Sequence, residues 1–192
     1  SWGVSTRLIG ALIMTHSDDR GLVLPPRMAP NKAVVVPIWR TEEEMTALKT
    51  RISTLTESWK GHLDYFVDDR DQYRPGYKFN EWEKKGIPIR IEIGPRDLEN
   101  NVAVLVRRDT GEKLTVSQDG LLNTIQETLE TMQQDLYQQA KELRERYTFK
   151  EDDFDRFKTR IEDPGGCFWV HWCGSEACET DFQDQSKATI RL

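Results

Sequence analysis

Apolar and polar positions alternate most clearly near the middle of the chain. Four isoleucines recur at every second position over residues 87–93, the spacing of a strand with one face in a hydrophobic core. Arg90 and Glu92 occupy the alternate positions, and Arg96 and Asp97 follow in a Gly-Pro turn. We therefore expect a strand that carries a cation and an anion on its solvent side.

Shorter apolar or alternating runs predict further strands at 33–38, 62–67, 101–107 and 113–117. The sequence Asp109-Thr-Gly-Glu112 between the last two is a hairpin signal. Strand, helix, strand, helix and strand followed by a hairpin indicate an α/β fold with a mixed five-stranded sheet and helices packed on it.

The first helix is predicted from its apolar spacing. Steps of three and four residues join five positions, Met45, Leu48, Ile52, Leu55 and Trp59. Thr41 with Glu44 forms a capping box at the start, and Gly61 stands where the helix should end.

A long helix is predicted over residues 120–147, where apolar residues keep nearly heptad spacing. Packing on the protein's own sheet, with a bridge to the next module, is the preferred interpretation. A coiled-coil partner is the alternative.

The two ends of the chain have a different character. Residues 1–14 begin abruptly and run into an apolar stretch typical of a strand, turn and helix, and residues 21–30 form a proline-rich linker. Near the other end, a charged stretch over 150–157 precedes residues 168–173, which we expect to be a strand entering a cysteine-bearing turn.

Composition narrows the function classes. The chain has 192 residues, 37% of them hydrophobic, and a net charge of −6, which argues against indiscriminate nucleic-acid binding. RNA binding would need a local basic patch, for which the candidates are Lys84, Lys85, Arg90, Arg96, Arg107, Arg108 and Lys113. No apolar run reaches the length of a membrane span and no secretory leader opens the chain, so we expect a cytoplasmic protein.

Hydrolytic chemistry has no visible basis in the sequence. His16, His62 and His171 stand apart, and neither a nucleophile elbow nor a phosphate-binding glycine loop is present.

Three segments in order carry a resemblance: the stub with Gly3, Arg7 and Gly10, the linker 21–30, and the block 74–97. Together they resemble prolyl-tRNA synthetases, class II enzymes, of the archaeal- and eukaryote-like type with a C-terminal zinc-type extension. By that resemblance, the stub is the end of class II motif 3, where Trp2, Gly3 and Arg7 would bind ATP.

The resemblance also implies a domain organisation. Residues 1–31 would be the tail of the catalytic domain with its linker, and 32–120 the anticodon-binding domain. Residues 121–148 would be the long helix that closes this domain, and 149–192 the truncated start of a small α+β zinc-type domain. Class II motifs 1 and 2 are missing, so this chain alone should not activate proline.

Proline tRNAs share two adjacent guanines in the anticodon. The resemblance assigns Glu83 and Arg90 to one guanine, and Arg96, Asp97 and Lys113 to the other guanine or to phosphates. A carboxylate accepts from guanine N1–H and N2–H, while a cation donates to O6 or N7. From the residues alone, Arg90 and Glu92 would be an exposed cross-strand ion pair worth well under ~1 kcal/mol.

Cys173 and Cys178 are separated by four residues, a spacing that suits half of a tetrahedral zinc site. In the resembling family the second cysteine pair lies downstream, so we expect an empty or incomplete site here. Two ordinary reduced cysteines are the alternative.

The function implied by the resemblance is recognition of tRNA(Pro) within a proline–tRNA ligase that uses Mg-bound ATP and dimerises through its catalytic domain. No membrane or DNA partner is expected. Two alternatives stay open: a non-catalytic accessory module of the same fold, and a sister synthetase for Gly, Thr or His.

Overall fold

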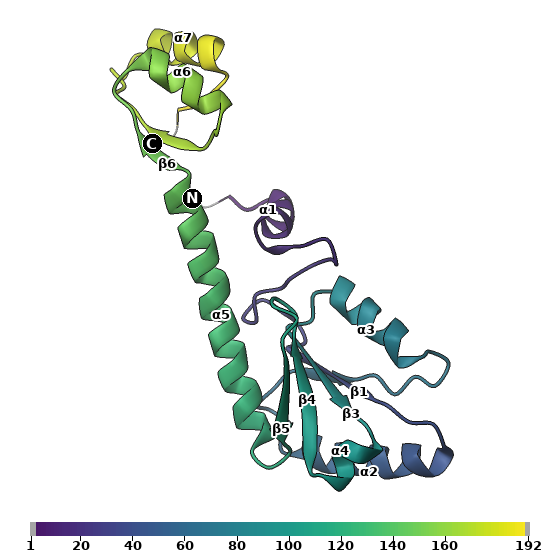
Figure 1. The fold of residues 1–192 in the computed structure, drawn as a ribbon. Helices are drawn as coiled ribbons and strands as arrows, with labels where there is room; N and C mark the ends of the chain where they lie inside the picture. The colour runs from purple at the N-terminus through teal and green to yellow at the C-terminus, as the bar shows by residue number, and fades with distance from the viewer. Residues whose placement is uncertain (1–2, 191–192) are drawn as a thin grey trace. The chain divides into compact units, whose positions relative to one another are not determined.

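A computed structural model describes residues 3–190 of the chain (Figure 1). The chain divides into two compact units, residues 1–137 and 138–192. The larger unit contains the five-stranded sheet, and each unit has its own core.

The sheet has the strand order β2-β1-β3-β4-β5. Its strands are β1 (Ala33–Pro37), β2 (Tyr65–Val67), β3 (Ile89–Ile93), β4 (Val102–Arg107) and β5 (Lys113–Ser117). Strand β1 pairs in parallel with β2 and β3, while β4 is antiparallel to β3 and β5. The expected mixed α/β fold is confirmed. The strands predicted at 62–67 and 87–93 begin three and two residues later than expected, because residue 62 belongs to a turn and residues 63–64 and 87–88 precede β2 and β3.

Two helices cover one face of the sheet. Helices α2 (Glu42–Glu57) and α5 (Leu121–Arg146) bury their apolar stripes, including Leu48 and Ile125, against the three isoleucines of β3. The predicted capping box begins α2, since Glu44 N–H donates to Thr41 Oγ1 over 3.3 Å and Arg40 and Thr41 N–H donate to the Glu44 carboxylate.

The first part of α5 packs on the protein's own sheet. This is the interpretation that the sequence favoured over a coiled-coil partner. Leu121, Ile125 and Leu129 belong to the main core, and Met132 and Leu136 form a smaller cluster with Val23.

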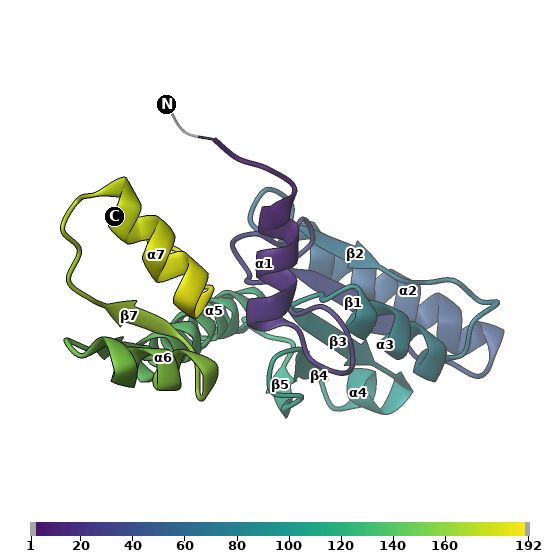
Figure 2. The same cartoon turned by 90° about the horizontal axis from the view of Figure 1, so that it is seen from above.

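Helix α3 (Pro75–Lys84) lies on the opposite face, so the strands run between α2 and α3 (Figure 2). Trp82 and Phe79 pack against Val34 and Val36 of β1. Because the side chains of β3 alternate, Arg90 and Glu92 point to this face and are buried there. The expectation that they stand on a solvent-exposed face is wrong, since α3 covers them.

The linker before β1 is bonded to the end of α3. Leu22 N–H donates to the Lys84 carbonyl and Leu24 N–H to the Gly86 carbonyl, over 3.1 and 3.3 Å. Gly21 (φ +133°) and Gly86 (φ +74°) permit this approach, because a Cβ at either position would lie within 2.7 Å of backbone atoms across the gap. Helix α1 (Arg7–His16) precedes the linker and buries none of its residues, while residues 3–5 have no regular structure, so the strand expected in the stub is missing from its described part.

The smaller unit contains β6 (Thr148–Lys150), α6 (Phe154–Glu162), β7 (Cys167–Trp169) and α7 (Glu176–Ser186), with β6 parallel to β7. The predicted strand at 168–173 is therefore shorter and begins one residue earlier. The core of the smaller unit is aromatic and is formed by Phe149, Phe154, Phe157, Phe168 and Phe182.

Asp68, directly after β2, is the buried anchor of α3. Its carboxylate accepts from Arg70 Nε, Arg70 Nη2 and Trp82 Nε1, each over 2.8 Å, and Lys78 Nζ donates to its carbonyl over 3.0 Å. Burial alone raises the pKa of Asp68, but the hydrogen bonds from Arg70 and Trp82 outweigh it and lower that pKa to about 2.

We predict that Asp68→Asn destabilises the protein by about 3 kcal/mol at pH 7, because it leaves buried donors without their carboxylate. Since the folded pKa lies below the unfolded one, the charge of Asp68 contributes its full stability above about pH 4 and loses it as pH falls toward 2. Urea unfolding between pH 7 and pH 2 should show wild type losing about 2 kcal/mol more than the variant in that acid window. Asp71→Asn, at an exposed position, should retain the wild-type pH dependence, and equal acid sensitivity of wild type and Asp68→Asn would contradict the role of this anchor.

Candidate nucleic-acid interface

A line of charged side chains crosses the α3 face of the sheet. Arg90 Nη1 donates to Glu83 Oε1 over 2.9 Å, and Arg90 Nε donates to Glu92 Oε1 over 3.0 Å. Lys113 Nζ lies 3.7 Å from the same Glu92 oxygen. The structure therefore brings together three of the predicted site residues, Glu83, Arg90 and Lys113, with Glu92 as the common anion.

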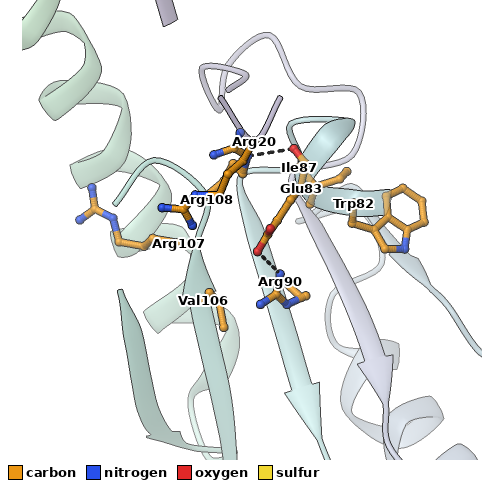
Figure 3. Close-up of a pocket in the computed structure, with 8 residues that line it drawn as sticks. All are labelled: Arg20, Trp82, Glu83, Ile87, Arg90, Val106, Arg107 and Arg108. Carbon is orange, nitrogen blue, oxygen red and sulfur yellow. Dashed lines mark hydrogen bonds and ion pairs between the residues drawn. The ribbon is translucent and has the colours of Figure 1, made fainter. Parts of the chain in front are cut away.

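Arg90 is rigid because it is held from several sides. Its side chain is only 8% exposed, and its guanidinium lies 4.2 Å from the centroid of the Phe79 ring. Figure 3 shows Glu83 reaching from α3 toward Arg90 on β3. The Glu83 side chain is 28% exposed and bonds Arg90 through Oε1 alone among the described residues, which leaves Oε2 without a hydrogen-bond donor there.

The sheet continues beyond the edge of α3 as an open surface. Glu92 is opposite Val104 of β4, and Val104 is opposite Thr115 of β5. Thr115 is exposed, as are Lys113 and Ser117, which share its face of β5 by the alternation of a strand. A flat ligand on this surface would meet a carboxylate oxygen, a cation and hydroxyl groups side by side.

Asp97 and Arg96 stand apart from this line, at the carboxyl end of β3 in helix α4 (Pro95–Glu99). Asp97 Oδ2 accepts from Gly94 N–H over 2.7 Å and so caps α4. Arg96 is exposed and makes no ion pair within residues 3–190. Helix α4 contacts α2 and β4, so neither residue is brought into the line of Glu83 and Arg90.

Arg108 is a positioning residue whose role the sequence did not indicate. Its Nε donates to the Glu83 carbonyl over 2.9 Å, and its two terminal nitrogens donate to the Asp18 carboxylate over 2.8 and 2.6 Å. This hydrogen bonding lowers the pKa of Asp18 to about 2. Arg108 thus fixes the last turn of α3, which presents Glu83, to the linker before β1.

The basic patch expected from the sequence is largely neutralised. Arg107 bonds to Asp109 and Asp135, each over 2.7 Å, and points toward α5 in Figure 3. Arg108 is paired with Asp18, and Lys85 with Glu81 over 2.7 Å. Of the seven candidate cations, Lys85, Arg90, Arg107 and Arg108 are therefore neutralised by neighbouring carboxylates.

The residues predicted to bind ATP do not contact the line of charged side chains formed by Glu83, Arg90, Glu92 and Lys113. Gly3 and Arg7 are exposed at the start of α1, and Trp2 lies outside the described residues. Nothing in the described chain brings Gly3 or Arg7 into contact with the other predicted site residues.

Cys173 precedes α7, and Cys178 lies in the first turn of that helix. A hydrogen bond from the Ser175 backbone and one from Cys178 lower the pKa of the Cys173 thiol, whereas the bond to Cys173 raises that of Cys178. Cys167 is exposed on β7. Between residues 3 and 190, no three or more Cys, His, Asp or Glu side chains are grouped to hold a metal ion, so two thiols alone do not form a complete tetrahedral zinc site.

Sequence comparison identifies a protein family and several similar proteins. Residues 32–128 match the family model of the anticodon binding domain. The chain is 52% identical over 194 aligned residues to a protein named proline–tRNA ligase of Chloroflexus aggregans, 48% identical to one of Roseiflexus sp. strain RS-1, and 46% identical to one of Amoebophilus asiaticus.

Each of these alignments covers the whole chain but only 39–40% of the relative, so the chain spans about two-fifths of the length of these proteins. None of the helices in the described part of the chain is both long and apolar enough to cross a membrane.

The family model covers just over half of the chain and includes all five strands of the sheet. Glu83, Arg90 and Lys113 lie inside the matched region, and the resemblance inferred from the sequence is confirmed. The chain belongs to the anticodon-binding domain family.

Proposed function

We propose that the larger unit recognises the anticodon of proline tRNAs as part of a proline–tRNA ligase. The observation that carries this proposal is the fixed line of Glu83, Arg90, Glu92 and Lys113 beside an open sheet surface. Guanine offers two donors on its Watson–Crick edge, and the free Oε2 of Glu83 supplies an acceptor for them. The names of the similar proteins support proline tRNA as the RNA.

Arg90 would act on the base through Glu83 and through its remaining N–H groups. Its hydrogen bond holds the Glu83 carboxylate in one orientation, so the acceptor does not have to be ordered when RNA binds. Lys113 would contact the second guanine or a phosphate, since its ammonium is exposed and only 3.7 Å from Glu92. Arg96 and Asp97 at the end of β3 would serve the neighbouring base or backbone.

Charge supports recognition of bases over indiscriminate backbone binding. The chain has a net charge of −6 and most cations near the site are paired. A surface of this kind gains affinity from hydrogen bonds to base edges and only a little from counterion release.

The activity of the parent protein is likewise a proposal. It would join proline to ATP as an adenylate and transfer it to the 3′ end of the tRNA, as the names of the relatives imply. Trp2, Gly3 and Arg7 would contact Mg-bound ATP in the parent, which would be a cytoplasmic homodimer. Zinc binding by Cys173 and Cys178 stays a prediction that requires further ligands.

The function is tested by binding this chain to an anticodon stem-loop RNA of proline tRNA and to stem-loops for glycine, threonine and histidine. The proposal expects preferential binding of the proline stem-loop, lost when both guanines are replaced by inosine. Equal affinity for all stem-loops would contradict it.

We predict that Glu83→Gln weakens binding of the proline stem-loop by about 1–3 kcal/mol, because one acceptor for guanine becomes a donor. Replacing the guanine it reads by inosine removes the N2 donor, so wild type and variant should then bind with more similar affinity. Fluorescence anisotropy titration measures both, with Glu127→Gln on the exposed side of α5 as the matched control. Equal losses on guanine and inosine RNA would rule out this contact.

Arg90→Lys should lower both stability and affinity, because an ammonium lacks the planar, fixed donors that guanidinium directs at Glu83 and Glu92 and cannot lie flat on Phe79. We expect a loss of about 1–3 kcal/mol in the free energy of unfolding, measured by urea denaturation. Arg96→Lys is the matched control, since Arg96 is exposed and should leave stability unchanged. Full stability of Arg90→Lys would mean that the buried pairing does not hold the site.

A further inference from the structure

A column of stacked side chains stands at the start of α3, away from the line of Glu83 and Arg90. The rings of Tyr73 and Tyr77 stack with centroids 4.6 Å apart and planes inclined by 15°. The guanidinium of Arg70 lies 4.9 Å from the centroid of Tyr73. Tyr77 is the outermost member, and it is 55% exposed against 36% for Tyr73.

The column is anchored in the protein interior. Arg70 bonds both oxygens of the fully buried Asp68 over 2.8 Å, and its Nη2 also bonds Glu81 over 2.6 Å. These charge-assisted bonds fix the guanidinium, and the guanidinium in turn fixes the Tyr73 ring. A rigid aromatic surface binds a flat ligand with little loss of side-chain entropy.

The fold itself does not use these two rings. Neither belongs to a hydrophobic cluster, and neither hydroxyl makes a hydrogen bond within the described residues. Tyr65 is the contrast, because it packs edge-on against Trp59 at 5.4 Å and its hydroxyl donates to the Thr56 carbonyl. Large exposed apolar area without a structural task is typical of a binding surface.

The chemistry of the column suits a nucleobase. Single-stranded RNA is bound by stacking of its bases on aromatic rings, with cations nearby for the phosphates. Arg74, directly before α3, is exposed and makes no ion pair in residues 3–190. Tyr77 lies six residues before Glu83 on the same helix, which is about 9 Å along its axis, so one RNA loop can reach both.

We propose that Tyr77, backed by Tyr73 and Arg70, is a stacking site for an unpaired base of the anticodon loop other than the two guanines. This inference rests on the proposed function and adds a contact that is independent of base identity. Its occupant is a nucleotide, since the rings are accompanied by the exposed cation Arg74 and lie on the same helix as Glu83.

The test is binding of proline anticodon stem-loop RNAs that carry a single abasic nucleotide at each loop position in turn. Tyr77→Leu keeps apolar bulk but removes the ring, so it should weaken binding of the intact stem-loop about ten-fold. Tyr77→Phe should bind within about two-fold of wild type. With the abasic nucleotide at the stacked position, wild type and Tyr77→Leu should bind equally.

Tyr137→Leu is the matched control, because Tyr137 is 62% exposed on α5, and it should bind as wild type does. Urea unfolding of Tyr77→Leu checks that the fold is retained. The inference is overturned if Tyr77→Leu binds intact RNA with wild-type affinity. It is also overturned if the variant binds every abasic RNA more weakly than wild type does, which is the result expected if the ring has a structural or protein-binding role. In those cases the affinity loss caused by Glu83→Gln would still be larger on guanine RNA than on inosine RNA, and the proposed function would stand. Absence of wild-type binding to any stem-loop would overturn both.

Discussion

The buried guanidinium of Arg90 is the constraint on which the arrangement of the interface depends. A cation on a strand that is covered by a helix must be neutralised, because transfer of a charge out of water is costly without a partner. Glu92 on the same strand and Glu83 on α3 meet this requirement, and Phe79 covers the flat face of the guanidinium. The last turn of α3 is therefore held to β3 by the same contacts that fix the Glu83 carboxylate.

Other buried charges extend this arrangement. Arg108 ties the Glu83 carbonyl to Asp18 of the linker, and Asp68 fixes Trp82 and Lys78 on the inner side of α3. Helix α3 is thus held by charged groups at Lys78, Trp82 and Glu83 while its apolar side chains pack on β1. An element that presents recognition groups benefits from such clamping, since precise hydrogen-bond geometry at a base edge needs a fixed backbone.

This design explains how an acidic chain can serve an RNA-binding family. Arg107 and Arg108 form ion pairs with aspartates of the same chain, so they contribute little long-range attraction for phosphate. The exposed groups are few and chemically distinct: a carboxylate oxygen of Glu83, the ammonium of Lys113, and the proposed stacking ring of Tyr77. Discrimination between RNAs would come from these short-range contacts.

Local periodicity was enough to predict most of the fold, because alternation and three-to-four spacing depend only on nearby residues. The isoleucines of β3, the capping box of α2 and the apolar stripe of α5 were all readable in this way. The ends of β2 and β3 were less predictable, since their limits depend on where a neighbouring strand offers hydrogen bonds.

The sequence by itself determined the fold class, the family resemblance and three members of the charged line, Glu83, Arg90 and Lys113. Only the tertiary structure decided that Arg90 and Glu92 are covered by α3, that Arg107 and Arg108 turn inward to aspartates, and that Tyr73 and Tyr77 stack on an anchored arginine. The physical reason is that burial and charge pairing are set by residues distant in sequence. No local pattern reveals which acid will neutralise which base, or which face of a strand a helix will cover.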